Sequence, residues 1–210
     1  TQGYSMNNSI LYSTLTRFGN YYPLKLTFNV NSIIEELNNN FNWVQYNPRK
    51  NIDREGLSIT SLDGGMTGRP DLDSLHEYYK KTGIDLDEPD FNTKTPVYPL
   101  FSKWLDPFEK YLGRTHVIRL NSGGYFPPHR DNKMSSIPSF RLFLPLNYGN
   151  GRYFLLEDSK MHFENGKMYF IDTAKMHTLF NANETPFYFV VANVILSEES
   201  VAKTLNFLYG

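Results

Sequence analysis

The sequence predicts a mainly β protein with flanking helices, in which short antiparallel strands form a sandwich or barrel of the jelly-roll kind. After Thr115, six short aliphatic and aromatic segments follow one another, and turns such as Gly123-Gly124 and Asn165-Gly166 separate them. No helical pattern alternates with these segments, which excludes repeated βαβ units. Aromatic residues make up 16% of the chain, and such residues suit sheet surfaces.

The first quarter of the chain mixes one strand, one helix and a second strand. Residues 24–30 and 57–62 alternate between apolar and polar side chains with period two, which predicts a strand in each segment. Between them, apolar residues recur at helical spacing over 33–41, after Asn31 or Ser32 as the N-cap.

Turn signals and two further helices follow. Residues 63–71 are predicted to form a Gly-rich loop, and 71–81 a short helix that ends at Gly83 as its C-cap. The acidic, proline-containing connection over 86–99 has no periodicity, and we expect its carboxylates to face solvent. A helix over 101–112 is expected to restart in its middle, with Asp106 as the N-cap.

The second half predicts the strands of the jelly roll and a closing helix after Ser197. We expect strands at 116–121, 140–146, 153–157, 168–172, 178–180 and 187–196. We expect the 210 residues to form a single domain, in which 113–210 are the jelly-roll core and 1–112 pack on it and cap it.

Composition and charge restrict the function. With 21 basic and 22 acidic residues, the net charge of −1 gives no case for a nucleic-acid partner. The chain has no cysteine, which excludes disulfides, iron–sulfur clusters, thiolate metal sites and cysteine nucleophiles. It contains no apolar stretch that could span a membrane and no signal peptide, so we expect a soluble cytoplasmic protein whose partner is a small molecule or a peptide.

Three residues form the best candidate metal site. His129 and Asp131 are separated by one residue, so on extended backbone their side chains point to the same side, and His177 lies 46 residues after Asp131. In a jelly roll, strands distant in sequence converge at one open end, where His177 could complete the set. Two imidazoles and one carboxylate hold a ferrous ion on one face and leave the opposite positions open.

The remaining three histidines give weaker signals. His76 lies in a polar helix, His162 lies in an exposed segment, and His116 is expected to face the core or to lie behind the metal ligands. None of them is predicted to be a ligand.

Four segments resemble those of a known family. These are Arg119-Leu-Asn-Ser-Gly-Gly-Tyr-Phe-Pro-Pro-His129-Arg-Asp131, Phe140-Arg141-Leu-Phe-Leu-Pro145-Leu, Gly166-Lys-Met-Tyr-Phe-Ile-Asp172 and His177-Thr-Leu-Phe-Asn181. In order and spacing they resemble the aspartyl/asparaginyl β-hydroxylase-like group of Fe(II)/2-oxoglutarate oxygenases, which also contains free-proline hydroxylases. The resemblance covers about residues 115–195. It implies a double-stranded β-helix, a cupin-like jelly roll, that uses Fe(II), 2-oxoglutarate and O₂.

The resemblance assigns the iron ligands and the reaction. It implies that His129, Asp131 and His177 bind the iron and that the enzyme hydroxylates a C–H bond. Related halogenases have Gly or Ala in place of the carboxylate, so Asp131 favours hydroxylation, although the same triad also supports demethylation, desaturation and ring closure.

One position departs from the family pattern. The family usually has an arginine ten residues after the distal histidine to bind 2-oxoglutarate, and here that position is Phe187. An apolar ring cannot replace a guanidinium, so another cation holds the co-substrate, or the co-substrate is different or absent. Arg141 is the first substitute and Arg119 the second, and for both a structural salt bridge is the competing interpretation.

Substrate contacts and the choice of function stay open on the sequence. Arg49 and Arg54 could bind a substrate carboxylate or face solvent, and Tyr125 and Tyr153 are candidate walls of the site. The first function is a 2-oxoglutarate-dependent hydroxylase acting on an amino acid, free or in a peptide. The alternative is a cupin-like module that binds a metal or a small molecule without oxygenase turnover.

Overall fold

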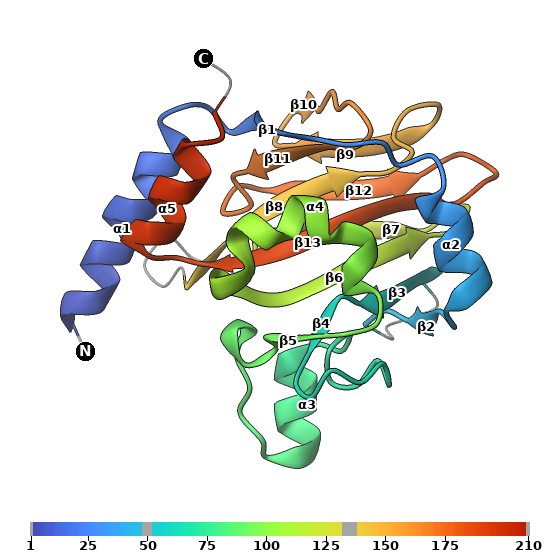
Figure 1. The fold of residues 1–210 in the computed structure, drawn as a ribbon, viewed down its shortest axis with the longest axis horizontal. Helices are drawn as coiled ribbons and strands as arrows, with labels where there is room; N and C mark the ends of the chain where they lie inside the picture. Colours follow the sequence, from blue (N-terminus) through green and yellow to red (C-terminus); the bar gives the residue numbers. More distant parts are fainter. Residues whose placement is uncertain (1, 48–51, 132–137, 209–210) are drawn as a thin grey trace.

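A computed structural model of the protein describes residues 2–47, 52–131 and 138–208. Two antiparallel sheets face each other, and helices cover the outer face of the larger one (Figure 1). The larger sheet has the order β1-β11-β8-β13-β6-β3-β2, and the smaller has the order β10-β9-β12-β7. This is a double-stranded β-helix, so the predicted fold class is confirmed.

The bounds of the elements are as follows. The larger sheet contains β1 (Tyr21–Thr27), β2 (Val44–Gln45), β3 (Arg54–Ser58), β6 (Leu112–Leu120), β8 (Ser139–Pro145), β11 (Lys167–Ile171) and β13 (Phe187–Ile195). The smaller sheet contains β7 (Tyr125–His129), β9 (Arg152–Leu156), β10 (Ser159–Lys160) and β12 (His177–Asn181). A separate pair consists of β4 (Thr60–Ser61) and β5 (Thr93–Lys94). The helices are α1 (Gln2–Thr16), α2 (Ile33–Asn40), α3 (Leu75–Thr82), α4 (Ser102–Leu105) and α5 (Glu198–Leu205), with 3₁₀ turns η1 (Glu88–Asp90), η2 (Tyr98–Phe101) and η3 (Asp106–Tyr111).

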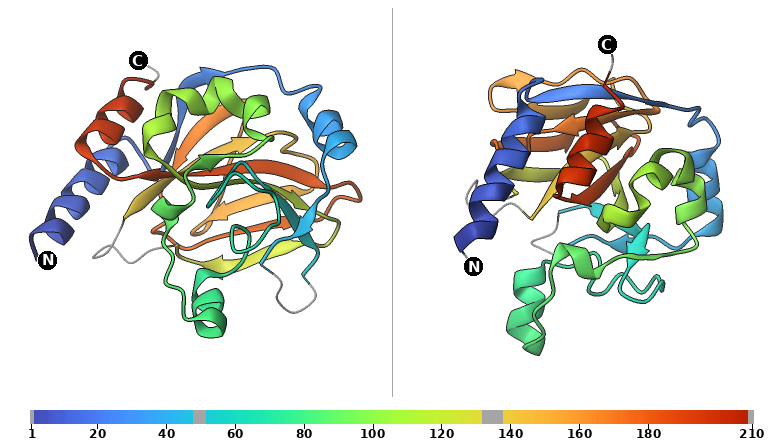
Figure 2. Two further views of the ribbon diagram at one scale, coloured as in Figure 1. Left: turned by 60° about the horizontal axis from the view of Figure 1, so that its bottom comes forward. Right: turned by 60° about the vertical axis from the view of Figure 1, so that its left-hand side comes forward.

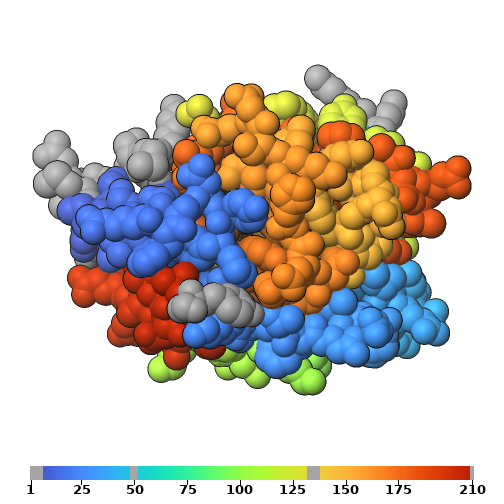
Figure 3. Space-filling model, turned by 90° about the horizontal axis from the view of Figure 1, so that it is seen from above, coloured from blue at the N-terminus to red at the C-terminus, as the bar shows by residue number. Residues whose placement is uncertain are grey.

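Strand alternation divides the core into two apolar clusters. On the inner face of the larger sheet, Ile118, Phe143 and Phe189 pack with Phe154 and Leu179 of the smaller sheet. On the outer face, the intervening residues pack against the helices and turns, where Trp104 is buried. The two ends of the chain contribute α1 and α5, which lie side by side at one edge of the molecule (Figures 1 and 3).

The N-terminal half does more than cover the barrel. Its β1 pairs with β11, and its β3 pairs with β6, so this half supplies strands at both edges of the larger sheet (Figure 2). The prediction that residues 1–112 pack on the core and cap it therefore describes only part of their role. α3 and the β4–β5 pair extend beyond the sheets (Figure 1).

Gly83 has the predicted role at a helix end, whereas Asp106 and the start of β1 differ from the prediction. Gly83 ends α3 with φ +73°, a left-handed conformation that glycine adopts without strain, as predicted. Asp106 is not an N-cap, because its carboxylate accepts a hydrogen bond from the Tyr98 hydroxyl at 2.9 Å, and η3 begins there in place of an α-helix. The sequence analysis missed α1 and β7, and β1 begins at Tyr21, three residues before the predicted strand.

None of the helices in the described part of the chain is both long and apolar enough to cross a membrane.

Candidate metal centre and its cavity

Strand pairing brings the three predicted metal ligands together at one end of the smaller sheet. His129 on β7 lies directly opposite His177 on β12, and the centroids of the two imidazole rings are 4.3 Å apart. Asp131 follows β7, and its backbone N–H donates to the Thr173 carbonyl at 3.0 Å. One potential ligand atom from each of the three lies within 4.8 Å of the other two.

The same backbone arrangement orients both imidazoles. Nδ1 of His129 lies 2.7 Å from the Pro127 carbonyl oxygen, and Nδ1 of His177 lies 2.9 Å from that of Lys175. A carbonyl only accepts hydrogen bonds, so each Nδ1 carries a proton and each Nε2 is the nitrogen that can bind a metal. Metal-binding histidines are held in this way by a partner behind the ring.

The two carboxylate oxygens of Asp131 have different partners. Its Oδ1 lies 3.2 Å from Nε2 of His129 and 3.6 Å from Nε2 of His177, whereas its Oδ2 lies 3.1 Å from Nε of Arg141. Burial raises the pKa of the carboxyl, but the Arg141 guanidinium and the two imidazoles outweigh burial and hold this pKa well below its ordinary value. Asp131 is therefore ionised, as a metal ligand must be.

The two imidazoles differ in their surroundings. Burial lowers the pKa of His177, which is 5% exposed and stacks on Phe154. Burial also lowers the pKa of His129, but its hydrogen bond to Asp131 and the charge of that carboxylate outweigh burial and raise the pKa above its ordinary value. Two Nε2 atoms and one carboxylate oxygen that face a common point fit a divalent transition metal, which on binding would displace the proton that Nε2 of His129 donates to Asp131.

The three residues line the mouth of a cavity of about 140 Å³ between the two sheets. Most of its wall is apolar and includes Phe143, Phe154 and Phe189. A polar band crosses the larger sheet at one level: Arg141 on β8 is opposite Asn193 on β13, and Arg114 on the next strand, β6, lines the same cavity.

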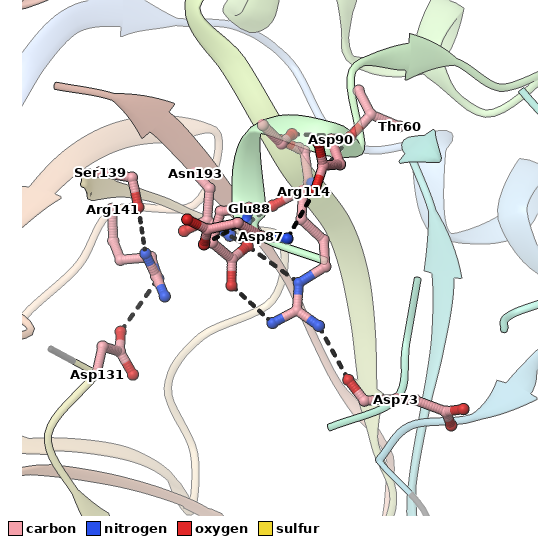
Figure 4. A network of polar contacts seen from close by, with 12 residues as sticks. Thr60, Asp73, Asp87, Glu88, Asp90, Arg114, Asp131, Ser139, Arg141 and Asn193 are labelled. Atoms are coloured by element: carbon pink, nitrogen blue, oxygen red, sulfur yellow. Dashed lines mark hydrogen bonds and ion pairs between the residues drawn. The ribbon is translucent and has the colours of Figure 1, made fainter. Parts of the chain in front are cut away.

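Arg114 is fixed by several partners (Figure 4). Its Nε and Nη2 donate to the two oxygens of Glu88 at 3.0 and 2.8 Å, and its Nη1 donates to the Asp73 carbonyl at 2.9 Å. Asn193 joins this network, because its Nδ2 donates to Glu88 Oε2 at 2.9 Å and to the Arg114 carbonyl at 2.6 Å. The Glu88 side chain is 12% exposed, so the prediction that this acidic segment faces solvent is wrong for Glu88.

Of the two predicted co-substrate anchors, Arg141 lies in the cavity and Arg119 lies outside it. Arg141 lines the cavity next to Asp131, and its Nη1 donates to Ser139 at 3.2 Å. Arg119 does not line the cavity, because strand alternation turns it to the face opposite Ile118. There its guanidinium binds Glu55 at 2.5 Å and lies over Trp43.

The predicted substrate residues lie outside the cavity. Arg54 is buried behind it, with its guanidinium over the Phe126 ring at 4.5 Å. Tyr125 and Tyr153 are adjacent in their strands to cavity residues and therefore point to the outer face, where Tyr153 stacks on Phe180. Arg49 lies outside the described residues.

Phe187 and the three histidines outside the candidate metal site were also considered in the sequence. Phe187 is fully buried in the aromatic cluster beside Phe189 and Tyr148, with ring centroids 4.8 and 5.7 Å away. His116 lines the cavity and is 4% exposed, whereas His76 and His162 are exposed and lie away from it.

Sequence reasoning missed Arg114, Asn193 and Tyr46 as cavity residues. A signal for Asn193 was present, since it is the one amide in the long apolar segment 187–196. Arg114 had no comparable signal, because its partner Glu88 lies in a segment without periodicity.

Comparisons with known proteins give one matching family and several similar structures. The family model for aspartyl/asparaginyl beta-hydroxylase matches residues 90–194, which is half of the chain. The chain is similar to an oxidoreductase of the 2OG-Fe(II) oxygenase family from Burkholderia pseudomallei, with 10% identity and a TM-score of 0.45 over 79% of this chain and 77% of that one. It is also similar to a cupin domain from Bordetella pertussis, with 17% identity and a TM-score of 0.32 over 40% of this chain and 81% of that one. No curated protein matches it.

Proposed function

Because the chain belongs to the aspartyl/asparaginyl beta-hydroxylase family, we propose that it is an Fe(II)- and 2-oxoglutarate-dependent dioxygenase that hydroxylates a C–H bond of an amino acid, free or in a peptide. The observation that carries the proposal is the convergence of His129, Asp131 and His177 on one point at the mouth of a buried cavity. With 2-oxoglutarate, a ferrous ion held there would supply the O₂ chemistry that side chains lack.

Each protein group has a definite task in this proposal. The Nδ1 hydrogen bonds fix the rings of His129 and His177, so that both Nε2 atoms face the metal. Arg141 holds Oδ2 of Asp131, which leaves Oδ1 as the ligand oxygen. The aromatic wall of the cavity keeps bulk water from the reacting centre.

Arg141 is the residue that we propose to bind a carboxylate of 2-oxoglutarate. An arginine has five N–H donors; on Arg141, the one on Nε faces Asp131 in an ion pair and one on Nη1 donates to Ser139. The other three have no partner among the described residues. A guanidinium beside the metal ligands can therefore bind a carboxylate with a charge-assisted contact.

The alternative is a binding module without turnover, and Phe187 is the observation that favours it. That ring is packed among other aromatic rings, so the usual co-substrate cation has no equivalent at its usual place. Under this alternative the cavity binds a metal or a small molecule but no 2-oxoglutarate.

Anaerobic addition of Fe(II) and 2-oxoglutarate distinguishes the two functions. Chelation of iron by 2-oxoglutarate gives a weak visible charge-transfer band, which we expect with Fe(II) and not with Zn(II) as the control. Succinate release under air, screened over amino acids and peptides, then tests turnover. A colourless complex that releases no succinate with any of them would support the binding module.

A further inference from the structure

The polar side chains that line the cavity include two buried atoms whose hydrogen-bonding capacity is unused. Oδ1 of Asn193 and Nδ1 of His116 are buried and have no hydrogen-bond partner among the described residues. The two residues are 1% and 4% exposed, and both line the cavity. Buried polar atoms are normally satisfied, so each such atom calls for an explanation.

The network around Asn193 fixes which of its two amide atoms is left without a partner. Its amide nitrogen is engaged by two acceptors, Glu88 Oε2 and the Arg114 carbonyl, so the nitrogen and oxygen cannot be exchanged without losing both bonds. The atom left over is therefore an acceptor. It needs an N–H or O–H donor from a ligand or from water.

This requirement excludes the co-substrate as its partner. 2-Oxoglutarate carries a keto group and two carboxylates, all of which accept hydrogen bonds and none of which donates at neutral pH. A ligand that satisfies Asn193 must therefore be a different molecule.

Arg114 supplies positively charged hydrogen-bond donors close to the Asn193 oxygen. Its bonds to Glu88 and to the Asp73 carbonyl use three of its five N–H groups, so two remain. A guanidinium prefers a carboxylate as its partner. Because Nε of Arg114 and Nδ2 of Asn193 donate to the same oxygen of Glu88, the two groups lie close together and one small molecule can reach both.

We propose that Arg114, Asn193 and His116 bind the primary substrate, and that this substrate is a small free carboxylic acid with an N–H or O–H donor on the carbon next to the carboxylate. The carboxylate binds Arg114, the donor binds Asn193 Oδ1, and His116 adds a further polar contact. The inference rests on the proposed function, since it assigns Arg141 to 2-oxoglutarate. The part of the cavity lined by Arg114, Asn193 and His116, called the recess below, is assigned to the substrate.

The size of the cavity and the chemistry of its ligand favour a free acid over an internal residue of a protein. The cavity of about 140 Å³ is well below the roughly 300–1,000 Å³ of pockets for drug-sized ligands. An internal residue has both backbone ends blocked, so it brings no carboxylate with a donor on the adjacent carbon. The α-amino acids and the α-hydroxy acids share the required chemistry, and the experiment separates them.

The test measures binding without turnover. With Mn(II) and 2-oxoglutarate under argon, thermal shift is screened over the common free L-α-amino acids, their α-hydroxy counterparts, their primary amides and the acids that lack the α-substituent. Affinities of the best probe and its derivatives follow by calorimetry. We expect a donor-bearing free acid to bind, and amidation or loss of the donor to weaken it about tenfold or more.

Two variants assign the contacts. Glu88→Met with Arg114→Met removes both charges of the buried pair, so that neither is left unpaired, and it should abolish the preference for the acid over its amide. Glu55→Met with Arg119→Met is the matched control, because it removes a similar pair whose arginine lies on the same strand as Arg114, β6, but on the opposite face. Asn193→Leu should remove the preference for the donor and keep the preference for the carboxylate.

Several results would overturn the proposal. If no free acid binds better than its amide while 2-oxoglutarate still gives the charge-transfer band with Fe(II), the recess holds ordered water only and the proposed function stands. If a blocked peptide binds as well as the free acid, the substrate class is wrong. If the band itself is absent, the proposed function has failed first.

Discussion

Nε of Arg141 lies 3.1 Å from Oδ2 of Asp131, on the oxygen turned away from both histidines. Asp131 follows a strand of the smaller sheet and Arg141 lies in the larger sheet, so this ion pair joins the two sheets at the mouth of the cavity. The same guanidinium therefore acts on the metal ligand and faces the position proposed for the co-substrate.

Replacing Arg141 by Met should weaken 2-oxoglutarate binding about ten- to a hundredfold, because a charge-assisted contact is lost. The measurement is a titration of the charge-transfer band, with the affinity for Fe(II) alone measured in parallel. Arg119→Met is the control, since that guanidinium lies outside the cavity. Unchanged co-substrate affinity in Arg141→Met would assign the anchor to another cation.

Replacing His177 by Ala should abolish metal-dependent turnover and reduce Fe(II) affinity at least tenfold, because one of three ligand atoms is removed. The fold should remain, which circular dichroism can check. His162→Ala provides a matched control at an exposed histidine. Full iron affinity in His177→Ala would show that another residue is the third ligand.

Replacing Phe187 by Arg should not create a co-substrate anchor. The side chain is fully buried among aromatic rings, so a guanidinium there would be a buried charge without a partner and should cost several kcal/mol of folding free energy. Urea unfolding measures this loss. A stable Phe187→Arg protein with tighter 2-oxoglutarate binding would contradict this interpretation of the aromatic cluster.

Because of His116, the metal-free protein should lose folding stability as the pH falls from neutral into the mildly acidic range. Burial, with help from Arg114 and Arg141, lowers the pKa of His116 well below its ordinary value, whereas in the unfolded chain it titrates near pH 6.5. Below about pH 6.5 the unfolded state therefore binds a proton that the folded state does not. Stability falls as the pH falls, by up to about 1.4 kcal/mol per pH unit.

The comparison of wild type with His116→Phe isolates this effect, since every other titrating group is common to both proteins. Urea unfolding at several pH values between 7.5 and 5 should give a smaller loss of stability in the variant. Parallel pH profiles would show that the pKa of His116 is the same in the folded and unfolded states and would contradict the prediction.

Limited proteolysis tests the prediction of a single domain. Exposed residues occur in both 63–69 and 85–99, so cleavage should begin in one of these two segments, and the bonds of Glu88 to Arg114 should slow cleavage next to Glu88. We expect the nicked halves to remain together, because β1 and β3 are paired with strands of the second half. Separation of a folded 113–210 fragment that binds iron would contradict the prediction.

The proximity of the three candidate metal ligands could be predicted because it follows from local spacing and strand direction. One intervening residue places His129 and Asp131 on the same side of extended backbone, and the turn before the next apolar strand places His177 at the same end of the barrel. The recess was harder to predict, because it depends on the packing of Glu88, from a segment without periodicity, against Arg114. α1 was missed since its polar sequence has no clear apolar stripe, although Tyr12 and Leu15 bury themselves against the barrel.

The pairing of β1 with β11 has a consequence for how the chain folds. Tyr21 is paired with Ile171, and Leu57 of β3 with Val117, so both early strands find their partners far along the sequence. During synthesis the first strand has no neighbour until most of the chain has emerged, and closing such long loops delays folding. The rate of refolding should accordingly be slow for a protein of this size, and exposed early strands make its nascent chain prone to aggregation.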